Sequence, residues 1–456
     1  MTRSAVLLMV MVSVHLPARA QSKPITIAEA VRLASEKYPS IEAARAEAAR
    51  AAASRSLART AYLPRADFLA QVNRATRNNV FGLLLPQPLP VLPAISGPVL
   101  GTNGMESVWG SAAGLRFSWE PFDFGQRRAA VEAAQAGERR ARQAVEAHRL
   151  AAGVGAAEAF LAVLAAREIL EAAQAAVERA RVFHRTVEAL ARAGLRPGAD
   201  AARAAAEVAA AEIQQLRAVE TLQQAQAELA RWLGLPAAEL APVAGKLMEL
   251  PGEVNMPPWE HPGLREQRAA LEEAQARERT FEHAWYPRFW IEAAAYGRGT
   301  GARTDGSAGG GLSGLGPNFQ NWAVGLNVTF PLLDRAALRA QRQREAEGER
   351  AEQERYRDLA RRLEAEQQKA ATRLDTARRI AQTTPVQLAS ARAAEQQATA
   401  RYQSGLGTAL EVAEAQRLLA QAEAEDALAR LGVWRALLGL AAAQGNLEPF
   451  LDAAGP

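Results

Sequence analysis

Residues 126–193 read QRRAAVEAAQAGERRARQAVEAHRLAAGVGAAEAFLAVLAAREILEAAQAAVERARVFHRTVEALARA, and this stretch decides the fold. It contains no proline, and 24 of its 68 residues are alanine. As a single helix it would be about 100 Å long. A compact globule is too small to provide packing partners along the whole length of such a helix. It needs helical neighbours that pack along it as in a coiled coil.

A second stretch of the same kind covers 335–404, where Pro385 is the one expected kink or break. Each long helix is followed by a turn that contains glycine. A further helix then returns alongside the first, and we predict these returning helices over 199–233 and 408–442. The chain is therefore expected to be mainly α-helical, with paired long helices.

The chain contains two copies of one pattern. Tyr38-Pro39 corresponds to His261-Pro262, which lies 223 residues later. Further on, Arg192-Ala193-Gly194-Leu195 corresponds to Gln403-Ser404-Gly405-Leu406, which lies 211 residues later. We therefore expect two tandem structural repeats, over 21–245 and 246–456.

Alternating apolar and polar residues predict two strands in each repeat. In the first repeat they cover 66–77 and 107–120; in the second, a helix over 263–285 is followed by strands over 288–300 and 319–331. One face of the 107–120 strand is apolar, with Trp109, Ala113, Leu115, Phe117 and Trp119. The segments between paired strands are too long for tight hairpins. Long loops at one end of the strands are typical of outer-membrane barrels.

Aromatic residues near the strand ends fit a membrane interface. Trp109 and Trp119 are ten residues apart, which in a tilted strand spans roughly 24 Å, about the height of an outer-membrane apolar band. Trp322 and Phe330 are the candidates in the second repeat. The alternative is that these are ordinary core aromatics.

The first twenty residues have the features of a secretory signal: a positive Arg3, an apolar run over 5–14 and the small-x-small sequence Ala18-Arg19-Ala20. The chain has no cysteine, which suits an oxidising compartment. After Gln21 no run of eighteen apolar residues occurs, so no transmembrane helix is expected. The formal charge of +4 comes from interleaved acidic and basic residues, a pattern that gives no support for nucleic-acid binding.

No catalytic or metal-binding pattern is visible. The histidines after the signal segment, His148, His184, His261 and His283, show no metal-ligand spacing. The triplet at 309–311 lacks the Lys-Ser/Thr of a phosphate-binding loop. We expect neither an enzyme nor a bound cofactor or metal.

In order and in duplicate, several motifs resemble those of the TolC-type outer-membrane efflux protein family, over nearly the whole chain. They are Ile25-Thr26-Ile27-Ala28-Glu29-Ala30-Val31 with Tyr38-Pro39, Tyr62-Leu63-Pro64, Glu120-Pro121-Phe122-Asp123-Phe124-Gly125, Pro331-Leu332-Leu333-Asp334 and Arg401-Tyr402-Gln403-Ser404-Gly405-Leu406-Gly407.

The resemblance implies a homotrimer with four strands from each chain, a twelve-stranded barrel in the lipid of the outer membrane and a helical tunnel in the periplasm. It also implies a passive exit duct of a tripartite efflux or type I secretion system, which docks to a periplasmic adaptor protein and an inner-membrane transporter. The competing hypothesis is a periplasmic coiled-coil scaffold or adaptor without a barrel, which explains the long helices but not the alternating strands.

The two glycine turns are the candidate periplasmic tips. They contain Gly194, Leu195 and Arg196 in the first repeat, and Gly405, Leu406 and Gly407 in the second. The resemblance implies that adaptor hairpins dock here. The other interpretation is a plain helix–helix turn in which glycine provides a left-handed cap, and both interpretations can be true.

The candidate aperture follows the second turn. Glu411 and Glu414 lie at i and i+3 and share one helix face. The resemblance matches them to acidic residues that line the family's periplasmic entrance, with Asp200 and Arg203 at the corresponding positions of the first repeat. Tyr402 matches a residue of the closing contacts, whose arginine partner is replaced here by Gly407. A ring of glutamates predicts cation selectivity and block by divalent ions. The alternative is that both glutamates are simply solvated.

Overall fold

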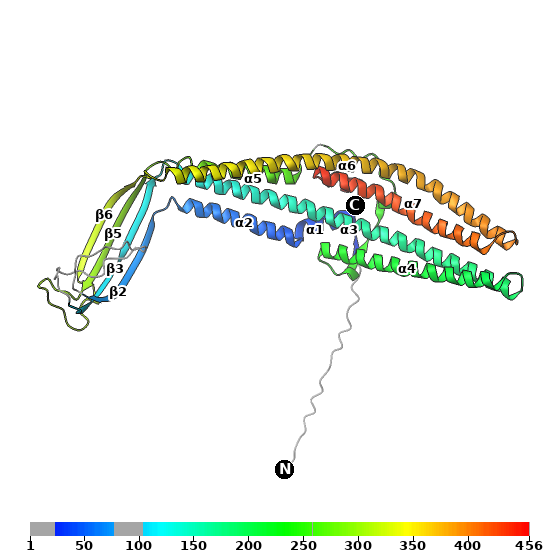
Figure 1. The fold of residues 1–456 in the computed structure, drawn as a ribbon, viewed down its shortest axis with the longest axis horizontal. Coiled ribbons are helices and arrows are strands. Elements are labelled where there is room, and N and C mark those ends of the chain that lie inside the picture. Colours follow the sequence, from blue (N-terminus) through cyan, green and yellow to red (C-terminus); the bar gives the residue numbers. More distant parts are fainter. Residues whose placement is uncertain (1–22, 77–103, 258, 456) are drawn as a thin grey trace, which may run out of the picture. The chain divides into compact units, whose positions relative to one another are not determined.

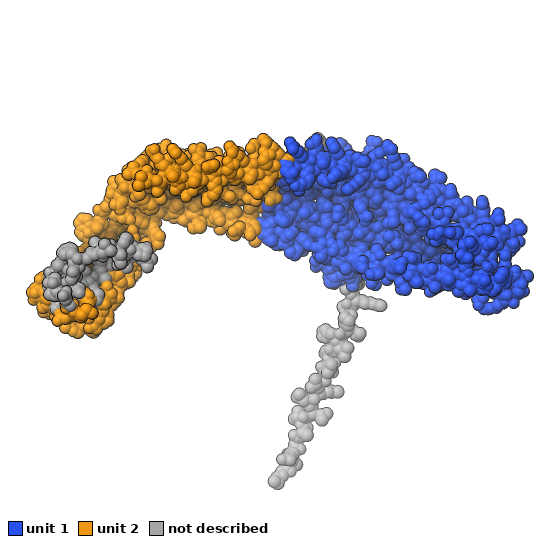
Figure 2. Space-filling model, viewed as in Figure 1, with its two compact units in different colours: residues 1–45, 143–265, 358–456 blue, residues 46–142, 266–357 orange. Residues whose placement is uncertain are grey.

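The computed structural model describes residues 23–76, 104–257 and 259–455. The predicted signal segment lies outside these residues. The chain divides into two compact units, which are described one at a time (Figure 2). One contains residues 1–45, 143–265 and 358–456, and the other contains residues 46–142 and 266–357. Each unit therefore takes segments from both predicted repeats.

The unit of residues 46–142 and 266–357 contains a four-stranded antiparallel sheet (Figure 1). Its strands lie in the order β2 (Arg65–Thr76), β3 (Ser107–Phe122), β5 (Arg288–Thr300) and β6 (Phe319–Thr329). Each strand pairs with its neighbours, and β2 and β6 are the two outer strands. Within the described part of this chain, both outer strands have one unpaired edge.

The strand register separates the sheet into an apolar and a polar face. One row places Phe68, Leu115, Ala295 and Trp322 side by side, and the rows on either side of it on this face are also mainly apolar. Three of these four side chains are well exposed. On the opposite face, Glu292 accepts hydrogen bonds from Arg116 at 3.1 Å and from Asn327 at 2.7 Å. The sheet thus has one apolar face and one polar face, an alternation that is typical of membrane barrel strands.

The helices of this unit end before the sheet in tight turns. Helix α2 covers Pro39–Thr60 and α5 covers Pro262–Thr280. The helix predicted over 263–285 is therefore five residues too long. Beyond Thr280, Phe281 and Glu282 donate to carbonyls three residues back instead of four. The helix changes there to the tighter i→i−3 pattern, because it must end before Pro287, which directly precedes the strand that begins at Arg288.

The long helices are α3 (Gln126–Arg192) and α6 (Arg335–Gln403). Helix α6 does not break at Pro385, which lies inside it. The proline removes one backbone donor, while the neighbouring Thr384 hydroxyl donates to the Asp426 carboxylate at 2.9 Å, with both side chains buried. This contact ties α6 to α7 (Ala409–Gln444) beside the proline.

The unit of residues 1–45, 143–265 and 358–456 holds the largest core. Thr26 caps α1 (Ile27–Lys37) by accepting from the Glu29 amide at 3.3 Å. Several elements here were not predicted: the parallel pair β1 (Lys23–Ile25) and β4 (Leu240–Pro242), the short helices η1 (Ala237–Glu239) and η2 (Gly245–Met248), and α8 (Glu448–Ala454). They surround a core that includes Phe160, Trp434 and Phe450.

Helix α3 contributes the middle of this core. By length and composition it includes one stretch that is apolar enough to cross a membrane, although no unbroken run of eighteen apolar residues occurs after Gln21. Of the residues in that stretch, 61% are buried inside the protein. Its hydropathy is therefore that of a core helix, because the alanine and leucine side chains already have protein neighbours.

Candidate functional site: two helical turns and their side chains

Helix pairs meet at two turns in the unit of residues 1–45, 143–265 and 358–456. One turn joins α3 to α4 (Gly198–Leu233), and the other joins α6 to α7 (Figure 1). Gly194 and Gly405 occupy equivalent left-handed positions, with φ of 70° and 82°. The following amides, of Leu195 and Leu406, donate back to the carbonyls of Leu190 and Arg401 at 2.9 and 2.8 Å. This is the glycine cap that the sequence predicts for each turn.

The leucine at the end of each turn points away from the core. Leu195 is 69% exposed and Leu406 is 75% exposed. No atom lies within 4 Å of the place where a side chain would begin on Gly194 or Gly405. Each turn therefore presents an apolar side chain on a backbone that a partner could approach closely.

Arg196 connects the two turns. Its Nη2 donates to the carbonyl oxygen of Tyr402 at 2.7 Å and to that of Gly407 at 3.4 Å. Its guanidinium also lies 4.5 Å from the centre of the Tyr402 ring. Arg196 was predicted to lie at the tip, but these contacts were not predicted, because they join residues that are 206 and 211 positions apart in the sequence.

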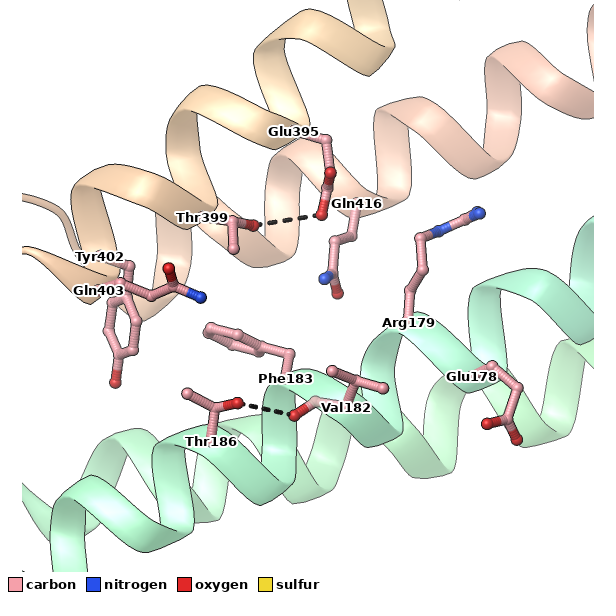
Figure 3. A pocket seen from close by; sticks show the side chains of 10 residues that line it. All are labelled: Glu178, Arg179, Val182, Phe183, Thr186, Glu395, Thr399, Tyr402, Gln403 and Gln416. Atoms are coloured by element: carbon pink, nitrogen blue, oxygen red, sulfur yellow. Dashed lines mark hydrogen bonds between the residues drawn. The ribbon is translucent and has the colours of Figure 1, made fainter.

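Tyr402 is the buried centre of this region, with only 1% of its surface exposed. Its hydroxyl donates to Asp200 Oδ2 at 3.4 Å, and its ring packs edge-on against Phe183 at 5.2 Å. Figure 3 shows Phe183 and Tyr402 lining one pocket together with Glu395 and Thr399. Burial, followed by the nearby Asp200 carboxylate, raises the pKa of Tyr402 above its ordinary value, although Arg196 opposes the shift.

Both predicted aperture glutamates are exposed, and each has an arginine nearby. Glu414 accepts from Arg417 Nη2 at 2.5 Å, and Glu411 Oε2 lies 4.0 Å from Arg401 Nε. All four residues line one groove between α6 and α7. The glutamates were predicted from the sequence and the arginines were not, although the i, i+3 spacing of Glu414 and Arg417 was a usable signal.

Polar and charged side chains join the sheet to the helices at the Glu120–Gly125 motif. Glu120 is 5% exposed and accepts from Arg288 Nε and Nη2 at 2.8 and 2.9 Å. Asp123 accepts from the Arg127 side chain and backbone at the start of α3. Burial alone would raise the pKa of Asp123, but these hydrogen bonds lower it below its ordinary value. The motif therefore holds the strand-to-helix corner with two ion pairs, of which Asp123–Arg127 is buried on both sides.

The predicted girdle residues have different surroundings. Trp119 Nε1 donates to the Tyr62 carbonyl at 3.1 Å, and Trp109 lies under the Arg74 guanidinium at 5.4 Å. Phe330 is exposed just beyond β6. Trp322 lies in the same cross-strand row as Leu115, and that row is four residues along β3 from the row of Trp119.

In the described residues, no group of three or more His, Cys, Asp or Glu side chains could hold a metal ion.

Comparisons with known proteins agree with this architecture. The family described as "Outer membrane efflux protein" matches residues 30–235 and 259–446. A comparison with curated proteins gave no significant match.

Among solved structures, the fold is similar to the outer membrane channel CmeC of Campylobacter jejuni, with TM-score 0.73, 17% identity, and coverage of 92% of this chain and 85% of that one. It is also similar to the outer membrane protein VceC of Vibrio cholerae, with TM-score 0.72, 19% identity, and coverage of 92% and 96%. Because the family match spans both halves and includes the strands, the hypothesis of a scaffold without a membrane sheet is set aside. The chain belongs to the outer membrane efflux protein family, and it is an exit duct of an efflux system in the outer membrane.

Proposed function

We propose that this chain is one protomer of a homotrimer, in which three four-stranded sheets close a twelve-stranded barrel and the long helices form a periplasmic tunnel. The observation that carries the proposal is the sheet itself. It has one apolar face and one polar face, and β2 and β6 each leave an edge unpaired in the described chain. Unpaired strand edges are not tolerated in lipid, so the sheet must close with other copies.

In this arrangement the apolar face meets lipid and the polar face, with Glu292 and Arg116, lines the lumen. Trp109, Trp119, Trp322 and Phe330 are then proposed to lie near the edges of the apolar band, with the tryptophan side chains anchored at the interface. The duct is proposed to be passive, with transport energy supplied by an inner-membrane transporter.

The mass of the purified protein in detergent tests the assembly. We expect a trimer that migrates as a compact species on a denaturing gel until it is heated. A second sample carries Val324→Asp, which places a charge on the proposed lipid face of β6 and should reduce barrel assembly. A folded helical monomer as the main wild-type species would overturn the proposal.

The two turns are proposed to be the docking site for a periplasmic adaptor. The supporting observation is the pair of exposed leucines, Leu195 and Leu406, on turns with open space around their glycines. Leu195→Trp with Leu406→Trp should block efflux in cells and leave the trimer intact. Leu57→Trp is the matched control, since Leu57 is 72% exposed on α2. Normal efflux with both turns altered would exclude docking at these residues.

Glu411, Glu414, Asp200 and Tyr402 are proposed to surround the periplasmic aperture. The support is their common location: Tyr402 and Asp200 are in contact, and Glu411 and Glu414 are on the first two turns of α7, directly after the second turn. Three copies would bring these groups together around the tunnel axis. The number of carboxylates alone predicts a cation-selective entrance, and the arginines beside them change that expectation.

A further inference from the structure

Arginine side chains accompany the acidic residues at the proposed aperture. Arg417 Nη2 lies 2.5 Å from Glu414, and the two residues are three apart on one helix. Because i, i+3 neighbours share a helix face, the guanidinium stays on the same side of α7 as the carboxylate even when the direct contact opens. The pairing of charges is therefore built into α7 and does not depend on one rotamer.

Arg401 is held in place by a different contact. Its Nη2 donates to the carbonyl oxygen of Leu406 at 3.3 Å, within the second turn, and its Nε lies 4.0 Å from Glu411. The backbone contact positions the guanidinium between the end of α6 and the first turn of α7. Glu411, in the first turn of α7, thus lies beside a cation that the second glycine turn orients.

The charges of both turns balance. Residues 193–208 and 401–418 contain four carboxylates and four guanidinium groups, so their net formal charge is zero. The carboxylates are Asp200, Glu207, Glu411 and Glu414, and the guanidinium groups are Arg196, Arg203, Arg401 and Arg417. At 0.1 M salt the Debye length is about 10 Å, so an ion on the tunnel axis senses nearby opposite charges together.

We propose that Arg401 and Arg417 are selectivity-determining residues, which compensate Glu411 and Glu414 and make the entrance weakly selective for charge. This rests on the proposed position of the aperture. Rings of uncompensated acidic side chains favour cations and hold divalent ions. A compensated ring does neither strongly, so the entrance admits anionic and zwitterionic solutes as well as cationic ones.

Single-channel recordings across a KCl gradient test this inference. The wild-type trimer should show a reversal potential near zero and little block by millimolar Mg²⁺ from the periplasmic side. Arg401→Gln with Arg417→Gln should raise the cation-to-anion permeability ratio by about tenfold, because each protomer then exposes uncompensated carboxylates. The same variant should become sensitive to Mg²⁺.

Two further variants separate charge from contact and locate the aperture. Arg401→Lys with Arg417→Lys keeps both positive charges and should retain the selectivity of the wild type. Glu411→Gln with Glu414→Gln should shift the reversal potential toward anion selectivity.

If the glutamate variant changes selectivity and the Arg→Gln variant does not, the arginines do not compensate the ring and the inference is wrong, while the aperture stays where it is proposed. If trimeric protein shows no change with either variant, both the aperture and the inference are wrong.

Discussion

The two turns of this chain share one backbone and differ in their side chains. Gly194 and Gly405 both take a left-handed conformation, and the amides that follow donate to equivalent carbonyls. One residue beyond each leucine, however, the first turn has Arg196 and the second has Gly407. The backbone was kept in both copies because two antiparallel helices need a left-handed residue and capped carbonyls to reverse direction.

The contact between the turns, in contrast, takes its donor from one turn and its acceptors from the other. Arg196 supplies the cation, and the second turn supplies the acceptors, since the carbonyls of Tyr402 and Gly407 both receive its hydrogen bonds. The helix starts differ too: Thr408 caps α7 by accepting from the Glu411 amide, whereas Pro197 precedes α4 without a side-chain cap. A duplicated backbone can thus carry a contact that exists only between the copies.

The largest effect is expected from Tyr402→Ala, which removes the ring that both turns share. Truncating a buried aromatic side chain costs about 3–5 kcal/mol, and here the loss should be local. Hydrogen exchange should accelerate in residues 183–204 and 402–412, with little change around Trp434. Uniformly faster exchange throughout the helices would mean that Tyr402 supports the whole fold and not the tips.

Arg196→Ala is expected to have the next largest effect. It removes two hydrogen bonds and one cation–π contact, worth together about 2 kcal/mol. The exposed Arg203→Ala is the matched control and should change the same exchange rates little. In a double-mutant cycle, Arg196→Ala and Tyr402→Ala should be clearly non-additive. Additive effects would show that Arg196 acts independently of the second turn.

Gly194→Ala and Gly405→Ala should each cost about 1–2 kcal/mol, because an L-residue is strained at positive φ. Since the two backbones are equivalent, the two variants should have similar effects on tip stability by hydrogen exchange. Gly198→Ala at the start of α4 is the control and should be neutral or stabilising. A marked difference between the two variants would show that the two turn backbones are not equivalent.

The smallest effect is expected from alkaline pH. The pKa of Tyr402 is raised above its ordinary value of 10.0 in the folded protein, mainly by burial. In the folded state the Tyr402 hydroxyl therefore keeps its proton to a higher pH than it does in the unfolded state. This contribution to stability is complete below about pH 10 and is lost as the pH rises through the folded pKa. Tyr402→Phe should remove that part of the alkaline loss, measured as tip exchange between pH 9 and 11 after correction for the intrinsic rate. An unchanged profile would show that Tyr402 titrates normally.

Much of the fold followed from local sequence patterns. The proline-free, alanine-rich run over 126–193 predicts α3 nearly to its ends, and period-two alternation predicts β3 and β6. These elements are readable because each carries its own periodicity over many residues. The pair β1 and β4 was missed because three-residue strands have too little pattern, and their pairing joins residues more than 200 positions apart.

The site divides in the same way. The sequence predicts the two glycine turns and places Glu411 and Glu414 on one face of the helix that follows the second turn, because turn chemistry and helical spacing are local. The contact of Arg196 in one copy with Tyr402 in the other, and the position of Arg401 near Glu411, are visible only in the folded chain. Those contacts depend on how helix pairs pack across the core, a free-energy balance over many side chains that no short stretch of sequence contains.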